Sequence, residues 1–246
     1  EKFAKFKNKI IYLKYDLEHK NIEKISPNDN EEVKSRKYIL NAGLRENDQR
    51  NFIINGIKEA KNEDMILISD VDEIPNLENF DFDKIKEKII MFKQDMFYYK
   101  FNLKLPNFTW TGTKACKKKY LETPQWLRNI KDRKFSFLRL DTLFSKTKYT
   151  NICFINNGGW HFTNIKTAAQ IEHKLKSYLH HREFDESPIS KTEINEIIKN
   201  KKAIYDLKVD KRSNKIGDGG KLEKCPMDKM PKFLQNNIKN YKDWVD

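Results

Sequence analysis

The chain has 246 residues, of which 35% are charged and 12% aromatic, and its formal net charge is +13. The aromatic content argues against a disordered chain, and the length is sufficient for one large α/β domain. Lysine supplies 41 of the 49 basic residues, whereas proteins that grip phosphates favour arginine. No nucleic-acid partner is therefore expected, although a basic surface suits an anionic substrate such as a nucleotide sugar.

The cysteines and the apolar runs of the chain narrow its class further. Cys116, Cys153 and Cys225 lie far apart in the sequence, so they indicate neither a zinc site nor a disulfide framework. No apolar run approaches the roughly 18 residues of a membrane-spanning helix, and no signal peptide is visible. These features predict no membrane segment in this chain and favour a cytoplasmic location. The sequence begins at Glu1 without a methionine, which is compatible with removal of an upstream segment.

The N-terminal part of the chain predicts a strand, a loop and a helix. Residues 9–15 contain a short apolar run typical of a strand, and residues 16–35 are rich in Asn and Asp, as loops are. Apolar positions at helical spacing predict a helix over residues 48–60, with Asn47 as its N-cap.

The first turn of that predicted helix would carry Gln49, Arg50 and Asn51. Free N–H groups at a helix start, together with a guanidinium, suit a diphosphate. The alternative for Arg50 is an ordinary salt bridge on the helix surface.

An apolar run at residues 65–68 ends abruptly in Ser69-Asp70-Val71-Asp72-Glu73-Ile74-Pro75. Its length and β-branched content predict a buried strand, and open α/β sheets bind ligands at the carboxyl ends of such strands. Asp70 and Asp72 would point the same way in an extended tip, where a divalent metal carrying a phosphate would relieve their repulsion. A solvated acidic turn is the alternative.

The middle of the chain predicts further alternation of helices and strands. We expect a helix over residues 80–92, a strand over 96–103, and an irregular connection over 104–134 that serves as a lid or an acceptor loop. Short strands are expected at 135–140 and 152–155. This order predicts an α/β fold with a mostly parallel central sheet flanked by helices.

A second conspicuous stretch follows, Gly158-Gly159-Trp160-His161-Phe162. Two glycines allow the backbone to approach a ligand closely. His161 is either a hydrogen-bonded structural residue or a third metal ligand beside the carboxylates.

The C-terminal part predicts three helices. One begins at Thr163 or Asn164 and ends near His181, where His180 and Glu183 cluster. Ser190 and Glu193 form a capping box that opens the next helix. Residues 210–224 are expected to be a loop, and residues 225–246 to hold a helix that docks on the core.

Together these motifs resemble glycosyltransferase family 17, which includes the enzyme that adds the bisecting N-acetylglucosamine of N-glycans. The resemblance covers nearly the whole chain as one domain, residues 1–246. It depends on residues 46–51, 67–75 and 158–162, with weaker matches at 174–175 and 230–234. The family's usual N-terminal strand, which helps to hold the nucleotide base, is absent here, and the His180 region carries one extra residue.

The resemblance implies a GT-A type nucleotide-sugar-binding fold and a role for each of several residues. The reaction would be inverting, metal-dependent transfer of a sugar, N-acetylglucosamine, from a UDP-sugar to a glycan acceptor, with Mn²⁺ or Mg²⁺ as cofactor. Asp70, Asp72 and His161 would hold the metal. Glu73, or otherwise Asp141, would be the general base. The residues implied to bind the donor are Gln49, Arg50, Asn51, Asp70, Trp160 and Lys174.

Two other functions are compatible with the residues. A metal-dependent nuclease or phosphotransferase would use the same carboxylates, and the net charge of +13 would suit its polynucleotide. A non-catalytic binding protein with a defective nucleotide pocket would explain the missing first strand.

Overall fold

A computed structural model describes residues 3–177, 184, 188–205 and 219–246, and within it the chain forms two compact units. The first unit comprises Glu1–Ile66 and Cys116–Thr150, and the second comprises Leu67–Ala115 and Asn151–Asp246. In the part of the chain that is described, no helix is both long enough and apolar enough to cross a bilayer.

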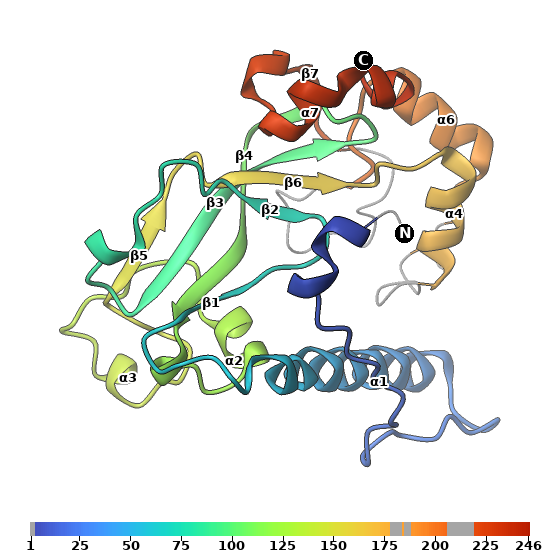
Figure 1. The fold of residues 1–246 in the computed structure, drawn as a ribbon. Helices are drawn as coiled ribbons and strands as arrows, with labels where there is room; N and C mark the ends of the chain where they lie inside the picture. Colours follow the sequence, from blue (N-terminus) through green and yellow to red (C-terminus); the bar gives the residue numbers. More distant parts are fainter. Residues whose placement is uncertain (1–2, 178–183, 185–187, 206–218) are drawn as a thin grey trace. The chain divides into compact units, whose positions relative to one another are not determined.

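The elements alternate irregularly along the chain (Figure 1). The helices are α1 (Glu31–Phe52), α2 (Pro124–Asn129), α3 (Leu140–Leu143), α4 (Ala168–Ser177), α6 (Lys191–Lys199) and α7 (Lys232–Asn237). The strands are β1 (Met65–Ile68), β2 (Glu73–Pro75), β3 (Ile89–Tyr98), β4 (Leu103–Lys117), β5 (Ile152–Ile155), β6 (Gly159–Thr163) and β7 (Glu223–Lys224). Short 3₁₀ helices occur at Ala4–Lys9, Ile53–Ile57, Phe82–Lys84, Lys118–Tyr120, Met227–Lys229 and Ile238–Trp244.

The strands form one mixed sheet in the order β1-β4-β3-β6-β2, with β5 also paired to β3 and β7 to β4. β3 runs parallel to β5 and β6, whereas the β3–β4, β2–β6 and β4–β7 pairs are antiparallel. The α/β class is confirmed, but the prediction of a mostly parallel sheet is wrong. The reason lies in the link from β3 to β4, which is a tight turn with Tyr99 at a φ of 61° and not a helical crossover.

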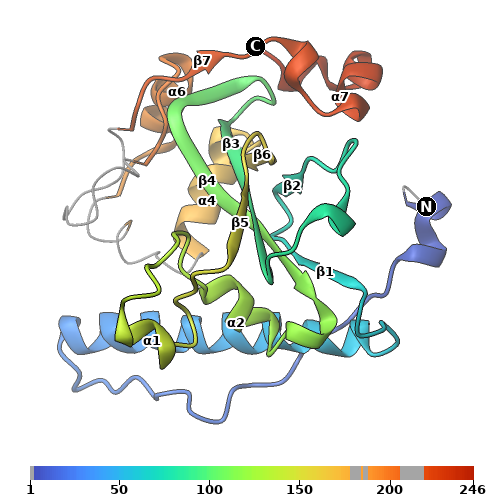
Figure 2. The ribbon, with the colours of Figure 1, turned by 90° about the vertical axis from the view of Figure 1, so that its left-hand side faces the viewer.

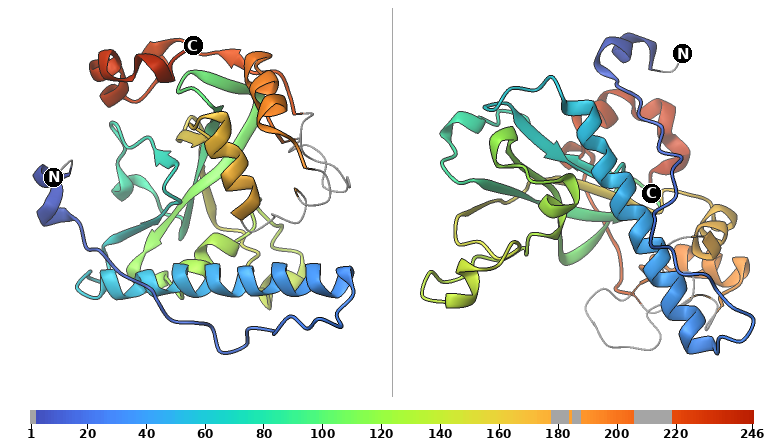
Figure 3. Two further views of the ribbon diagram at one scale, coloured as in Figure 1. Left: turned by 90° about the vertical axis from the view of Figure 1, so that its right-hand side faces the viewer. Right: turned by 90° about the horizontal axis from the view of Figure 1, so that it is seen from below.

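The second unit is organised around β3, whose side chains are almost all buried. Helices α4 and α6 pack together and share one apolar cluster with β3 (Figure 3). Ala168, Ile171 and Leu175 of α4 are buried in it. The helix begins at Ala168 and not at the predicted start, Thr163 or Asn164, because Thr163 ends strand β6. The capping box at Ser190 and Glu193 is also confirmed.

A second cluster in the same unit joins Phe97 of β3, Phe162 of β6, and Met230 and Leu234 of the C-terminal segment. The C-terminal segment thus packs on the core of this unit through Met230 and Leu234. Its helix is shorter than expected, because α7 ends at Asn237 and a 3₁₀ helix follows.

The first unit is built on α1, which packs against α2 (Figure 2). Asn30 caps α1 by accepting a hydrogen bond from the Val33 N–H at 2.9 Å, with Glu31 and Glu32 in the first turn. The helix therefore begins well before the predicted start at residue 48. Gln49, Arg50 and Asn51 lie in its last turn, so they offer no free N–H groups to a phosphate.

Other predicted elements also differ from the structure. Residues 10–19 have no regular structure, because the apolar run there pairs with no described strand and its side chains are largely exposed. The segment 135–140 is not a strand. Residues 80–92 hold a 3₁₀ helix and the start of β3, since an apolar run such as Ile89–Phe92 suits a buried strand as well as a helix.

Strand β4 and helix α2 replace most of the irregular connection predicted at residues 104–134. Pro106 and Gly112 suggested a break, but the strand tolerates both. The β3–β4 register shifts between Asp95 and Phe97, opposite the part of β4 that contains Pro106, and proline is accepted at such irregularities. The predicted cluster at His180, His181 and Glu183, and most of the 210–224 loop, lie outside the described residues.

Candidate active site

The acidic segment after β1 is a tight turn in the second unit and not an extended tip. The Glu73 N–H donates to the Asp70 carbonyl oxygen at 3.0 Å, and Val71 and Asp72 form the corner. The Asp70 N–H in turn donates to the Glu73 carboxylate at 3.0 Å. The Glu73 side chain therefore closes the turn by accepting this hydrogen bond. The closed turn fixes the position of Asp72.

Strand β6 brings His161 to this turn. β2 and β6 pair with Glu73 opposite His161, and the Phe162 N–H donates to the Asp72 carbonyl oxygen at 2.9 Å. As a result, His161 Nε2 lies 3.4 Å from Asp72 Oδ2. Two of the three predicted metal ligands, Asp72 and His161, are therefore neighbours in the structure, although they are far apart in the sequence.

Gly159 makes this pairing possible. Its φ is +130°, which side-chain-bearing residues rarely adopt, and a Cβ at this position would lie 2.1 Å from the Ile74 carbonyl oxygen. The close approach predicted for the paired glycines is therefore to strand β2. By allowing β6 to approach β2 closely, Gly159 fixes the β2–β6 register. This register places His161 beside Asp72.

Charge at the site is set by Asp72, His161 and Lys174. Burial raises the pKa of Asp72, but hydrogen bonding and charge from His161, with the Lys174 ammonium, outweigh it, so the pKa is lowered overall. Burial lowers the pKa of Lys174, while the charge of Asp72 opposes that change. Lys174 Nζ donates to Asn164 Oδ1 at 2.9 Å. The predicted donor-binding residue Lys174 thus shares an electrostatic environment with Asp72.

Glu73 is buried, and its two carboxylate oxygens hold different groups. Oε1 accepts from Trp110 Nε1 at 2.8 Å and Oε2 from the Asp70 N–H at 3.0 Å. A general base must reach the acceptor hydroxyl. These contacts favour a positioning role for Glu73 over the predicted role of base.

Trp110 of β4 is a site residue that the sequence did not single out. Its ring centroid is 5.2 Å from that of His161, and Glu73 anchors its indole. The alternating Thr-Trp-Thr-Gly-Thr stretch at residues 109–113 is a strand signal that could have placed this side chain. Trp110, and not Trp160, is therefore the aromatic wall beside His161.

Trp160 lies on the opposite face of the sheet. It precedes His161 on β6, and successive strand residues point to opposite faces. Its indole Nε1 donates to the Lys229 carbonyl oxygen at 2.9 Å, and its ring packs on the cluster around Phe97. The predicted contact of Trp160 with the sugar is thus replaced by a role in anchoring the C-terminal segment.

A row of polar side chains, of which Thr113 and Gln94 are buried, connects to Ser69 beside the turn. Ser69 Oγ and Thr113 Oγ1 are 2.6 Å apart, and Gln94 Nε2 donates to the same Thr113 hydroxyl at 3.3 Å. A Cβ on Gly112 would come within 1.7 Å of Gln94 Oε1, so this row requires glycine there. Among the described side chains, Gln94 Oε1 and His161 Nδ1 are buried without a hydrogen-bond partner.

The remaining predicted site residues belong to the first unit, where they make local contacts. Arg50 donates to Gln125 at 2.5 Å and to Glu46 at 2.7 Å, and Asn51 accepts from the Gln125 N–H at 3.0 Å. Arg50 and Asn51 thus join α1 to α2. Gln49 lies in the last turn of α1.

Asp141, the second candidate base, also lies in the first unit. Hydrogen bonds from Arg139 at 2.8 Å and Lys148 at 2.6 Å hold its pKa well below the usual range. A carboxylate with a lowered pKa is a weaker base, so these ion pairs argue against a role in proton abstraction.

Asp72 offers a hard carboxylate oxygen, which suits Mn²⁺ or Mg²⁺, and His161 offers an imidazole nitrogen, a ligand more typical of Zn²⁺, Cu²⁺, Fe²⁺ and Ni²⁺. Over residues 3–177, 184, 188–205 and 219–246, no three His, Cys, Asp or Glu side chains converge to hold a metal. A cation at this pair would therefore take further oxygens from a bound diphosphate or from water, as Mg²⁺ sites with substrate phosphates do.

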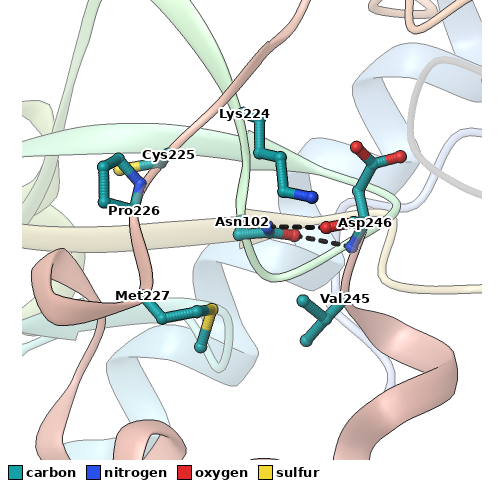
Figure 4. A pocket seen from close by; sticks show the side chains of 7 residues that line it. All are labelled: Asn102, Lys224, Cys225, Pro226, Met227, Val245 and Asp246. Atoms are coloured by element: carbon teal, nitrogen blue, oxygen red, sulfur yellow. Dashed lines mark hydrogen bonds between the residues drawn. The ribbon is translucent and has the colours of Figure 1, made fainter.

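A separate cavity of about 520 Å³ lies at the C-terminal segment and contains none of the predicted site residues (Figure 4). Asn102, which is fully buried, clamps the Asp246 backbone there with bonds of 2.8 and 3.2 Å. The residues that line the cavity are Asn102, Lys224, Cys225, Pro226, Met227, Val245 and Asp246.

Comparison of the chain with protein-family models, with curated proteins and with solved structures gives no match.

Proposed function

We propose that the chain is an inverting, metal-dependent glycosyltransferase of the GT-A type that moves a sugar, N-acetylglucosamine, from a UDP-sugar to a glycan acceptor. The observation that carries the proposal is the 3.4 Å approach of His161 Nε2 to Asp72 Oδ2. The two residues come from two of the three main motifs on which the resemblance to glycosyltransferase family 17 depends.

The separation of 3.4 Å between His161 Nε2 and Asp72 Oδ2 supports a shared cation better than it supports a direct hydrogen bond alone. A good N–H···O bond is shorter, near 2.9 Å. Two ligands at about 2.1 Å from one metal and at right angles to each other are separated by about 3 Å, so a separation of 3.4 Å needs little adjustment.

The two ligands are unequal. A cation on His161 Nε2 leaves the ring proton on Nδ1, which is buried and has no acceptor among the described residues. Asp72 carries the charge, is only partly buried and interacts with Lys174. We therefore assign Asp72 the larger share of donor binding and His161 the smaller.

The chain's own residues would bind and position the donor. Asp72 and His161 hold the metal, which when bound would neutralise the charge on the departing diphosphate. Lys174 adds a cation beside Asp72. Glu73 positions the acidic turn and the Trp110 indole, and Trp110 walls the site beside His161.

Turnover of UDP-N-acetylglucosamine with Mn²⁺ tests the proposal. Asp72→Asn should lower release of UDP by roughly 10²-fold or more, because it removes the charge that balances the metal. Asp83→Asn is the matched control, since Asp83 is exposed in the same unit and outside the site. Equal turnover by the two variants would refute the assignment, and metal-dependent DNA cleavage without sugar release would favour the nuclease.

A further inference from the structure

A loop in the first unit has an unusual surface. It runs from Ile130 to Tyr149, includes α3, and is called the basic-apolar loop below (Figure 3). The Lys131 N–H donates to the Thr147 carbonyl oxygen at 2.8 Å and the Phe135 N–H to that of Tyr149 at 3.1 Å. These bonds close the base of the loop, and residues 136–145 extend beyond it.

Beyond this base the loop exposes large apolar side chains. Phe137, Leu138, Leu140 and Phe144 are 79%, 77%, 75% and 89% exposed. Single exposed apolar residues are common, but four within eight positions of one closed loop indicate a surface that meets another apolar phase. By contrast, Phe135 at the base is buried, so it anchors the loop.

Cations surround the Phe135 ring, which anchors the loop. The Arg133 guanidinium lies 4.7 Å and that of Arg139 5.6 Å from the Phe135 ring centroid, with Lys148 Nζ at 5.8 Å. Asp141 holds Arg139 and Lys148 in ion pairs. Lys131, Arg133, Lys134 and Lys146 add exposed positive charge at the ends of the same loop.

We propose that the basic-apolar loop docks on an anionic lipid surface. Phe and Leu side chains flanked by Lys and Arg are the pattern of segments that lie in the membrane interface, where the apolar groups enter and the cations meet lipid phosphates. A nucleic acid would also attract the cations, but exposed leucines gain nothing from it. The proposal concerns the first unit alone and does not depend on the proposed enzymatic function.

Flotation of the whole chain with vesicles tests this. Vesicles containing phosphatidylglycerol should carry the protein at low salt, whereas pure phosphatidylcholine vesicles should carry much less. The double variant Phe137→Ser/Phe144→Ser should lower the partition coefficient by roughly tenfold or more, because two aromatic groups no longer enter the interface. The double variant Arg133→Gln/Lys134→Gln should lower it by roughly tenfold and weaken its dependence on salt.

Matched controls lie outside the loop. Ile11→Ser/Tyr12→Ser removes exposed apolar groups elsewhere in the first unit, and Lys191→Gln/Lys199→Gln removes two exposed charges from α6. Both controls should bind vesicles like the unmodified chain. Equal losses of vesicle binding in the loop variants and the control variants would overturn the proposal. The proposal would also be overturned if the unmodified chain did not float with the vesicles. That holds equally if the chain binds single-stranded RNA or self-associates instead.

Discussion

The longest helix of the first unit and the central strand of the second are stabilised in different ways. In the second, β3 runs through the core and large side chains such as Phe92, Phe97 and Tyr98 are fully buried. In the first, the 22-residue helix α1 buries a single residue, and that residue is Asn41. Asn41 accepts from the Glu23 N–H and donates to the Glu23 carbonyl oxygen, both at 2.8 Å. Strand β3 thus depends on apolar burial, whereas the one buried side chain of α1 makes paired polar contacts.

The contrast implies that mutations should act differently in the two units. Burial contributes in proportion to the apolar area removed from water, so truncating a core side chain has a large cost. A polar contact contributes little net free energy, but breaking one half of it leaves a buried group unsatisfied.

The largest expected effect is in the core of the second unit. Phe97→Ala should lower the free energy of unfolding by about 3–5 kcal/mol, because Phe97 is fully buried against Phe162 and Leu234. Ile39→Ala on the exposed face of α1 should change it by no more than about 0.5 kcal/mol. Urea denaturation of both variants measures the difference. Similar losses would mean that α1 contributes as much apolar burial as β3.

Two glycines give the next contrast. Gly159→Ala should destabilise the second unit by at least about 1–3 kcal/mol from its φ alone, before the clash with Ile74 is counted. Gly43→Ala in α1 meets nothing within 4 Å and should stabilise the first unit by roughly 0.5–1 kcal/mol. Thermal unfolding monitored by circular dichroism would show shifts of opposite sign, and shifts of the same sign would contradict this account.

The polar clamp in the first unit comes third. Asn41→Ala should cost about 1–3 kcal/mol, because it leaves the N–H and the carbonyl of Glu23 without their partner. Asn41→Asp keeps the acceptor but sets a buried carboxylate against the Glu23 carbonyl oxygen, so its cost at neutral pH should be at least as large. Hydrogen exchange at the Glu23 amide reports the loss directly, and unchanged protection in Asn41→Ala would exclude the clamp.

Alkaline pH should affect the second unit through its buried tyrosines. Burial raises the pKa of both Tyr98 and Tyr99 well above the usual range. A raised pKa in the folded state means that the stabilisation is complete below the unfolded value of about 10 and is lost as the pH rises above it. Tyr98→Phe should therefore flatten the fall in stability at alkaline pH. A profile as steep as that of the unmodified chain would count against burial as the cause.

The sequence predicted best where a signal was local and strong. Strands β1 and β5, the capping box at Ser190 and the buried face of α4 all follow from short patterns. The predicted neighbours Asp72 and His161 are adjacent, since each follows or lies in a strand of the same sheet.

The sequence failed where tertiary packing overrode the pattern. Helix α1 has almost no apolar stripe, so periodicity could not find it. The apolar run Ile89–Phe92 suits a helix and a buried strand equally, and the packing of β3 decides between them. In β4, Pro106 and Gly112 resembled breaks, but one lies opposite a register shift and the other makes room for Gln94.

The central claim is that Asp72 and His161 together hold a cation and its diphosphate. The most direct measurement is the shift in melting temperature produced by Mn²⁺, by UDP and by both, in the unmodified chain, Asp72→Asn and His161→Gln. The account predicts that both ligands together stabilise the unmodified chain more than the sum of each alone, with this surplus lost in Asp72→Asn and reduced in His161→Gln. An undiminished surplus in Asp72→Asn would contradict it.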